Sequence, residues 1–202
     1  MIKHILVPLD GTPQSNSALP LTRTLARATG ASVTLLRVRL PGEDRQQLAA
    51  LQRVEAELSS SDIQVNSVVR DGDPVDQIID QVRADSTDLV VMRTHGRSGI
   101  GRAVLGSVTE RVVAEGGAPV ILLRAGGRRI NQLRSILVPL DGSPGSLVAL
   151  GLAIPLADDA LTGAARALLG SVTDSVVRKS DCPVLVVHRA HPTAHTQAGA
   201  PT

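Results

Sequence analysis

The sequence predicts an α/β fold of the doubly wound kind, with an open parallel sheet and a truncated second α/β repeat. Apolar runs alternate with amphipathic stretches along residues 1–124, which is the strand, helix, strand pattern of such folds. The apolar runs are nearly continuous in Val, Ile and Leu, as expected for strands buried on both faces. Two motifs from this region also return later in the chain, which indicates an internal repeat.

Five apolar runs are the expected strands, and four amphipathic segments between them are the expected helices. The strands are predicted at residues 4–9, 32–38, 63–69, 88–92 and 119–123. The helices, with Leu, Ala, Val and Ile at helical spacing, are predicted at residues 15–30, 43–60, 73–85 and 104–116. Ligands of doubly wound sheets bind beyond the carboxyl ends of the strands. We therefore look for chemistry in the loops after Leu9, Val38 and Met92.

The repeat divides the chain. The segment ILVPLDGTP at residues 5–13 returns as ILVPLDGSP at 136–144, and LGSVTE at 105–110 returns as LGSVTD at 169–174. Within the second copy the two motifs lie much closer together than they do in the first copy. The second copy therefore lacks its interior. The predicted organisation is a complete domain, a linker, a truncated repeat and a small, polar tail that we expect to be disordered. These parts cover residues 1–124, 125–134, 135–190 and 191–202.

Composition argues against several classes of protein. The formal net charge is only +2 and no residue is aromatic, whereas nucleic-acid binding needs a clustered basic face or stacking side chains. Cys182 is the single cysteine, so neither an intrachain disulfide nor a cysteine metal cluster is expected. No apolar run reaches the length of a membrane span, and the N-terminus does not resemble a signal peptide. We expect a cytoplasmic protein that binds neither nucleic acid nor membrane.

The loop after the fourth strand is rich in glycine. It reads THGRSGIGR at residues 94–102, and a helix is predicted to begin near Gly106, Ser107 and Val108. Glycines allow close approach of a ligand, and the amides and dipole of a helix start favour an anion. The loop therefore fits a phosphate site. A second interpretation needs no ligand, because Ser107 and Glu110 also fit a capping box.

Other polar residues at these strand ends have two interpretations each. Asp10 follows the first strand, where a carboxylate accepts hydrogen bonds from ribose hydroxyls, but the sequence Asp-Gly-Thr-Pro is also strong turn chemistry. Arg97 and Arg102 are placed either to neutralise a phosphate or to remain in solvent. His95 has no Ser, Cys or carboxylate at a telling spacing, so we interpret it as a loop histidine with structural hydrogen bonds.

The sequence lacks familiar catalytic motifs. It has no Gly-x-x-x-x-Gly-Lys-Ser/Thr, His-Glu-x-x-His or Gly-x-Ser-x-Gly. Lys3 and Lys179 are the only lysines, and neither lies in the glycine-rich loop. The usual machinery of phosphoryl transfer is therefore missing, and we assign no catalytic or metal-binding residue.

Taken together, these motifs resemble the universal stress protein family. The resemblance is carried by ILVPLDGT at residues 5–12, by THGR at 94–97 followed by GSVTERVV at 106–113, and by APVILL at 118–123. It spans residues 1–124. It implies a Rossmann-like, five-stranded parallel sheet of order 3-2-1-4-5. In members that bind ATP it also implies a Gly-x-x-Gly-x9-Gly-Ser/Thr pattern at the loop and helix start.

The resemblance further implies a set of nucleotide contacts. The phosphates are expected near Gly96, Gly106, Ser107 and Val108, the ribose near Asp10, and adenine near Pro8, Leu9 and Val38. Arg97 is included as a candidate phosphate contact from its place in the loop. The implied cofactor is ATP, alone or with Mg²⁺. The first glycine of the pattern is replaced by Arg93, which either crowds the nucleotide or reaches its phosphates.

Three functions follow from this interpretation. The first is an ATP-binding stress-response protein acting as a nucleotide-dependent regulator, with no or very slow hydrolysis. The second is a nucleotide-free, dimerising scaffold of the same fold, and the third is an enzyme that transfers or hydrolyses phosphate. The family resemblance also implies antiparallel pairing of residues 119–123 with 183–187, within one chain or between two. We further expect strands at 136–140 and 183–188 to be neighbours in a unit that docks on the first domain.

Overall fold

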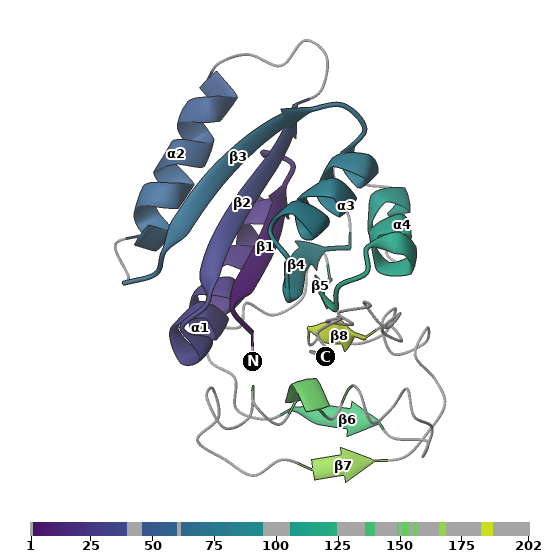
Figure 1. Ribbon diagram of the computed structural model, residues 1–202. Coiled ribbons are helices and arrows are strands. Elements are labelled where there is room, and N and C mark those ends of the chain that lie inside the picture. Colours follow the sequence, from purple (N-terminus) through teal and green to yellow (C-terminus); the bar gives the residue numbers. More distant parts are fainter. Residues whose placement is uncertain are drawn as a thin grey trace, which may run out of the picture.

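The computed structural model of the chain describes residues 2–39, 46–59, 62–94, 106–124, 136–139, 149, 151–153, 156, 166–168 and 183–187. Helices cover both faces of a central sheet, and a small two-stranded sheet lies below it in Figure 1. In the described part of the chain, no helix has the length and apolar character that a membrane span requires.

The central sheet has six strands in the order β3-β2-β1-β4-β5-β8. Its first five strands are parallel: β1 (His4–Leu9), β2 (Ser32–Arg39), β3 (Val65–Asp71), β4 (Leu89–Arg93) and β5 (Val120–Leu123). The five predicted strands and their order 3-2-1-4-5 are thereby confirmed. The expected antiparallel pairing of residues 119–123 with 183–187 is also confirmed within the chain, because β8 (Val184–Val186) pairs with β5 and adds a sixth strand at the edge of the sheet.

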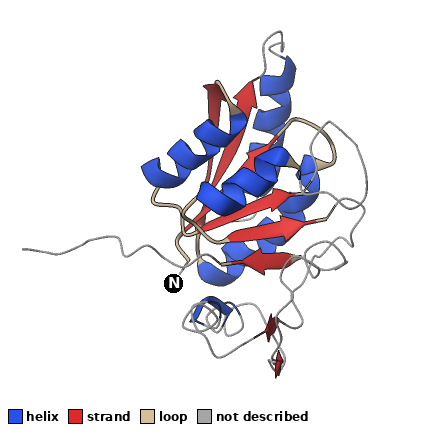
Figure 2. Cartoon of the chain, turned by 90° about the vertical axis from the view of Figure 1, so that its right-hand side faces the viewer, coloured by secondary structure: helices blue, strands red, loops and turns tan. Residues whose placement is uncertain are grey.

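The helices lie where the amphipathic segments predict them. After β1 a 3₁₀ turn, η1 (Ser15–Ala18), leads into α1 (Leu19–Thr29), and after β2 comes α2 (Gln46–Ser59). The other two helices are α3 (Pro74–Ala84) and α4 (Ser107–Glu115). Figures 1 and 2 show the sheet between the two pairs. α1 and α2 cover one face, and α3 and α4 cover the other.

Alternation along the strands builds two separate cores. In β1, Ile5 and Val7 face a first core with α1 and α2, whereas Leu6 faces a second core with α3 and α4. These side chains are at most 1% exposed. Burial on both faces is the reason that the strands are continuously apolar, since a one-sided sheet would alternate apolar with polar residues.

Helix ends follow local sequence signals. Asp73 caps α3, because its Oδ1 accepts hydrogen bonds from the backbone amides of Val75 at 3.0 Å and Asp76 at 3.3 Å. Pro74 occupies the first turn, where its missing amide hydrogen costs nothing. α1 ends at Gly30, whose φ of 70° is the left-handed conformation that glycine adopts readily.

The second copy divides between two sheets. β6 (Leu137–Pro139) pairs with β7 (Arg166–Leu168) in a parallel two-stranded sheet, while β8 joins the central sheet. The expectation that residues 136–140 and 183–188 are neighbours is therefore wrong. In the first copy β4 lies between β1 and β5. Among the described residues of the second copy, β6 has β7 as its parallel partner, and β8 pairs with the edge of β5 in the central sheet.

Parts of the second copy contact the first. Leu156 is 3% exposed and belongs to the first core, and Ile136 and Leu185 pack against that core. Val184 and Val186 pack against the second core. These contacts agree with the expected docking on residues 1–124. The predicted linker at 125–134 and tail at 191–202 lie outside the described residues, as does Cys182.

Candidate functional site

The carboxyl ends of β1 and β4 mark the point where the winding of the sheet reverses. The segment after β1 leads to α1 on one face, and the segment after β4 leads to α4 on the other. β1 pairs with β4 at Ile5 and Leu6, whereas it pairs with β2 as far as Leu9. Adjacent strands whose connections leave toward opposite faces form the usual ligand crevice of such folds.

The start of α4 has no side-chain cap. Gly106 is the N-cap residue, in an extended conformation with φ −60° and ψ 148°, and Ser107 is already the first helical residue. The proposed capping box of Ser107 and Glu110 is therefore wrong by one position. The amide of Glu110 donates to the Gly106 carbonyl at 3.0 Å, as the first ordinary helical bond. Among the described residues no side chain caps these first-turn amides, and amides in this position favour an anion.

Backbone contacts fix this helix start to the end of β4. The Gly106 amide donates to the Thr94 carbonyl at 2.9 Å, and Thr109 Oγ1 donates to the Arg93 carbonyl at 3.1 Å. A Cβ atom at position 106 would lie 3.1 Å from the Thr94 oxygen. Glycine therefore lets the chain approach β4 closely, and the first turn of α4 is held at the crevice.

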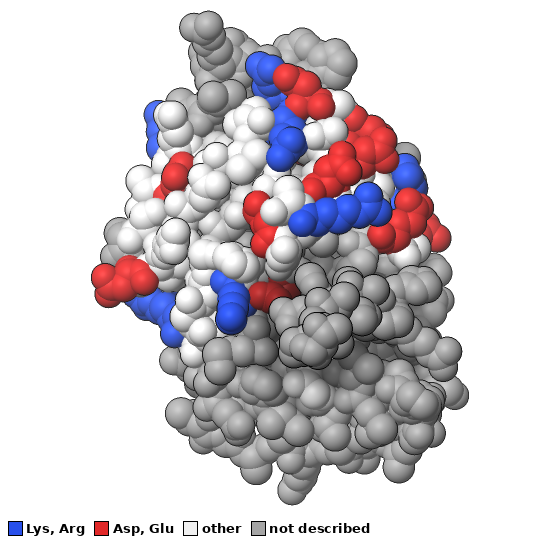
Figure 3. Space-filling model, in the orientation of Figure 1, with Lys and Arg blue, Asp and Glu red and all other residues white. Residues whose placement is uncertain are grey.

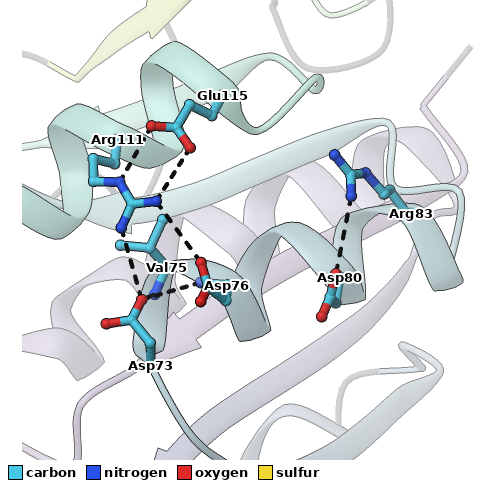
Figure 4. Close-up of polar contacts among 7 residues, drawn as sticks. All are labelled: Asp73, Val75, Asp76, Asp80, Arg83, Arg111 and Glu115. Atoms are coloured by element: carbon cyan, nitrogen blue, oxygen red, sulfur yellow. Dashed lines mark hydrogen bonds and ion pairs between the residues drawn. The ribbon is translucent and has the colours of Figure 1, made fainter.

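An ion-pair cluster ties α4 to the start of α3 (Figure 4). Arg111 lies 3.9 Å from Asp73, 3.7 Å from Asp76 and 3.2 Å from Glu115. All four side chains are about half exposed, so each pair stabilises the fold only weakly. Figure 3 shows acidic side chains with interspersed arginines on this side of the molecule. The cluster orients α4 and is separate from the crevice residues.

Asp10 forms a tight turn directly after β1. Its Oδ1 accepts hydrogen bonds from the Thr12 amide at 2.9 Å and from Thr12 Oγ1 at 2.6 Å. The Ser15 amide then donates to Thr12 Oγ1 at 3.2 Å, which connects the turn to η1. The turn interpretation of Asp10 is thus present in the structure. It occupies one carboxylate oxygen and places the half-buried side chain at the crevice.

The surroundings of Asp10 favour its charged form. Burial acts to raise the pKa of this carboxyl group, but hydrogen bonds from Thr12 and Ser15 and the positive charge of Arg37 outweigh it. The net effect lowers the pKa of Asp10 below its ordinary value. An ionised carboxylate is a strong acceptor for hydroxyl groups, so the site presents a fixed negative acceptor at neutral pH.

Arg93 is tied to η1. Its Nη1 donates to the Gln14 carbonyl at 2.9 Å and to Ser17 Oγ at 3.0 Å. Burial lowers the pKa of Arg93, against the opposing effect of the Asp10 charge. Its Nε is buried without a hydrogen-bond partner among the described residues. The guanidinium thus lies near Asp10 on the α1 side, and its contacts with η1 hold it away from the face that carries α4.

Arg37 is a site residue that the sequence did not reveal. It is 3% exposed at the end of β2, and its Nη1 donates to the Leu9 carbonyl at a long 3.4 Å. Gly11, with φ of 77°, lies directly against this guanidinium. In a strand pattern an arginine usually indicates a solvent-facing position. The feature of the sequence that could have indicated Arg37 was its position near the carboxyl end of a strand that neighbours β1.

The residues expected around adenine lie on different faces. Val38 is half-buried and packs against the second core, on the side of α3 and α4. Pro8 is half-buried and lies one position before Leu9 on β1. Leu9 itself is 5% exposed and turns into the first core. Val38 and Pro8 therefore remain available as apolar contacts, whereas Leu9 offers its backbone.

Comparison with known proteins decides the family. The model of the universal stress protein family matches residues 1–124 and 159–188. The chain belongs to the universal stress protein family.

Curated relatives and solved structures agree with this family assignment. A universal stress protein from Thermus aquaticus is 28% identical over 137 residues, which is 61% of this chain and 100% of that protein. One from Methanocaldococcus jannaschii is 27% identical over 141 residues, covering 61% and 83%. The structure of a universal stress protein from Archaeoglobus fulgidus matches with a TM-score of 0.69 and 19% identity, covering 86% of this chain and 80% of that one. The last comparison shows a shared fold.

Part of the universal stress protein motif lies beyond what the structure describes. Gly96 and Arg97, expected at the phosphates, are outside the described residues, as are His95 and Arg102. Among the described residues, Asp10, Arg93, Gly106, Ser107 and Val108 come from the two segments that border the crevice. No group of three or more metal-ligating side chains occurs in this described part.

Proposed function

We propose that this universal stress protein is a cytoplasmic, ATP-binding stress-response protein that acts as a nucleotide-dependent regulator. The observation that carries the proposal is the start of α4, where Gly106 leaves the first-turn amides without a side-chain cap at the point where β1 and β4 part. An anion is the acceptor such amides favour. The comparison with related universal stress proteins supports a nucleotide as the source of this anion.

Each part of ATP has a proposed position. The amides of Ser107 and Val108, with the loop residues Gly96 and Arg97, contact the phosphates. The Asp10 carboxylate, held in place by Thr12, accepts hydrogen bonds from the ribose. Pro8, Val38 and the Leu9 backbone contact the base. Any accompanying Mg²⁺ is held mainly by phosphate oxygens and water, as is usual for this ion.

Arg93 is compatible with this arrangement. Its hydrogen bonds to Gln14 and Ser17 hold it against η1, which supports a position of the long side chain beside the ribose and not across it. Its buried Nε and its charge add a positive potential beside Asp10. We propose that Arg93 supports binding of the anionic ligand through this charge.

A solved relative supports an adenine nucleotide as the ligand. A universal stress protein in complex with cAMP matches this fold with a TM-score of 0.51 and 22% identity. That ligand contains a base, a ribose and one phosphate, the same three parts for which positions are proposed here. Hydrolysis is proposed to be absent or very slow, because the sequence carries none of the phosphoryl-transfer motifs.

We also propose that residues 135–190 are a truncated second copy that binds no nucleotide. Its strand β8 pairs with β5 through Val120 with Val186, Ile121 with Leu185 and Leu122 with Val184. This internal contact closes the edge that would otherwise pair with a second chain. We therefore favour an internal pseudo-dimer over a homodimer.

Calorimetric titration with ATP and Mg²⁺ tests the nucleotide site. Two variants at the exposed Ser107 make a matched pair, since S107E adds a negative charge at the start of α4 and S107Q does not. Glutamate in a first helical turn stabilises the helix, so a loss of binding cannot come from unfolding. We expect saturable binding in the wild type, most of it retained in S107Q, and at least a tenfold loss in S107E.

Two other outcomes would change the assignment. A folded wild-type protein that releases no heat with ATP would contradict the nucleotide regulator and favour the nucleotide-free scaffold. Rapid release of phosphate under the same conditions would favour the enzyme. Circular dichroism confirms folding in each case, because a chain without aromatic residues gives no useful intrinsic fluorescence.

A further inference from the structure

A row of side chains crosses three strands at the carboxyl edge of the sheet. The parallel register pairs Val38 of β2 with Arg70 of β3 and pairs Leu9 of β1 with Arg37 of β2. Asp10 follows Leu9 directly, so it continues this row beside Val38. Neighbouring strands are about 4.8 Å apart, which places the backbone of Arg70 roughly 10 Å from that of Asp10. This distance suits a nucleoside whose ribose lies at one end.

Arg70 points to the face that carries the proposed site. Val68, two residues earlier on β3, packs against the second core, as Val38 does. Arg70 itself donates to Gln81 on α3, from Nε at 2.9 Å and from Nη2 at 2.8 Å. Its guanidinium therefore lies on the side of α3 and α4, which is also the side of the α4 N-terminus.

The contact with Gln81 fixes Arg70 without neutralising it. Gln81 is 3% exposed, and a single amide oxygen accepts both hydrogen bonds. The neighbouring strand end differs, because Arg39 is paired with the carboxylate of Asp71 at 2.8 and 2.6 Å. Among the described residues Arg70 forms no ion pair with a carboxylate, and its bonds to Gln81 use two of its five N–H donors. Its orientation is set by a buried partner before any ligand binds.

We propose that Arg70, held by Gln81, contacts the base of the bound nucleotide and determines which bases the site accepts. This role rests on the proposed nucleotide binding. A base that covers Val38 extends from the ribose at Asp10 toward Arg70. The N–H groups of Arg70 then donate to ring acceptors on the far edge of a purine. A pyrimidine is one ring smaller and stops short of them, so the site prefers purines.

Calorimetry with ATP, UTP and inorganic tripolyphosphate separates this role from general binding of phosphate. R70M keeps the length and apolar stem of the side chain and removes its donors. We expect the wild type to bind ATP about tenfold more tightly than UTP, and R70M to lose that preference. Binding of tripolyphosphate, which has no base, should change less than twofold. Q81L leaves Arg70 unheld and should reduce the preference for ATP by a smaller factor.

R39M is the matched control. It removes an arginine from the same edge of the sheet but from β2, where its partner is Asp71, and it should leave the ratio of ATP to UTP affinity unchanged. Thermal denaturation of each variant shows that it is folded.

The possible failures are distinguishable. If R70M retains the wild-type ratio of ATP to UTP affinity, Arg70 only joins β3 to α3, and the base-contact role is overturned while nucleotide binding stands. If R70M weakens ATP, UTP and tripolyphosphate equally, Arg70 acts through its charge and the role is again overturned. If the wild type binds no nucleotide, the proposed function and this role fall together.

Discussion

The strands of the two copies of the repeat are arranged differently in the structure. In the first copy, five consecutive strands form one sheet, and its central strands β1 and β4 are covered on both faces. The second copy places β6 with β7 in one sheet and β8 at the edge of the other. Segments that carry the same sequence motif therefore need not pair with equivalent strands. In the first copy β4 lies between β1 and β5, whereas in the second copy β6 pairs with β7 and β8 pairs with β5.

The comparison also shows what each copy contributes. The first copy supplies the crevice, with Asp10 at the end of β1 and Gly106 at the start of α4. The second supplies β8, which covers the edge of β5 with three residue pairs. Asp141, the counterpart of Asp10 in the repeat, lies outside the described residues. Under the proposed function, the first copy binds the nucleotide and the second copy covers the edge of β5.

The largest expected effect tests whether the two copies share one core. Leu25 of α1 is fully buried and Leu156 of the second copy is 3% exposed, both in the first core. Truncating a buried leucine leaves a cavity, so L25A and L156A should each lower the free energy of unfolding by about 3 kcal/mol. Chemical denaturation followed by circular dichroism measures both. The exposed Gln52 on α2 provides a control, and Q52A should change stability by less than about 0.5 kcal/mol. A near-zero effect of L156A beside a large effect of L25A would separate the two copies.

The next effect concerns the edge that β8 covers. Leu185 is opposite Ile121 and packs against the first core. L185D places a charge in this apolar contact, which should cost about 2 kcal/mol and release β8. The exposed edge of β5 should then pair with a second chain. Light scattering over a range of concentrations should show a monomeric wild type and a self-associating variant. L185V keeps an apolar, strand-favouring residue and should remain monomeric. Equal masses for wild type and L185D would show that β8 does not protect this edge.

Much of this fold could be predicted from the sequence, because strands buried on both faces leave a simple apolar signal. The five strands of the first copy were expected within three residues of their observed bounds. The strand order came from the family resemblance. β7 was not predicted, since Arg166, Ala167 and Leu168 carry no strand signal. Pairing with β6 makes this segment a strand, and such a partner is invisible in local sequence.

The candidate site was less predictable. Asp10 directly follows a strand, and Gly106 directly precedes a helix. Turn residues mark both points, so both positions could be inferred. Arg37 and Arg70 sit inside strands, and only the register places them beside Leu9 and Val38. The cap of α4 was misplaced by one residue, because Ser-x-x-Glu fits equally well when the serine is already helical. Site chemistry carried by neighbouring strands depends on pairing that one strand's sequence does not contain.

Substitutions at two glycines of the first copy test the contact between Arg37 and the turn after β1. Gly11 and Gly30 have similar φ angles of 77° and 70°, so alanine costs about 1 kcal/mol of conformational strain at each. A Cβ at Gly11 would also lie 2.5 to 2.8 Å from the Arg37 guanidinium, whereas nothing lies within 4 Å at Gly30. Because Arg37 is buried, G11A should destabilise the fold by about 1 kcal/mol more than G30A in denaturant titrations. Equal effects would mean that Arg37 moves aside freely.

The smallest expected effect is the pH dependence of Asp10. Burial acts to raise its pKa, while hydrogen bonds from Thr12 and Ser15 and the charge of Arg37 lower it, with a net lowering. A carboxyl group whose pKa is lower in the folded state stabilises the protein above its unfolded pKa, and this contribution is lost as pH falls through the folded pKa. D10N should therefore be less stable than wild type by about 1 kcal/mol between pH 5 and 7.

Below about pH 4, where the unfolded carboxyl group takes up its proton, this difference between D10N and wild type should shrink toward zero. Thermal or denaturant unfolding across that range measures it. D80N, at a carboxylate 60% exposed and 4.0 Å from Arg83, should change stability by less than about 0.5 kcal/mol throughout. The sign of the Asp10 effect is what matters. If burial outweighed the hydrogen bonds, the charge would destabilise the fold, and D10N would be the more stable protein at pH 7. That result would show that burial of the Asp10 charge costs more than the hydrogen bonds in the turn after β1 supply.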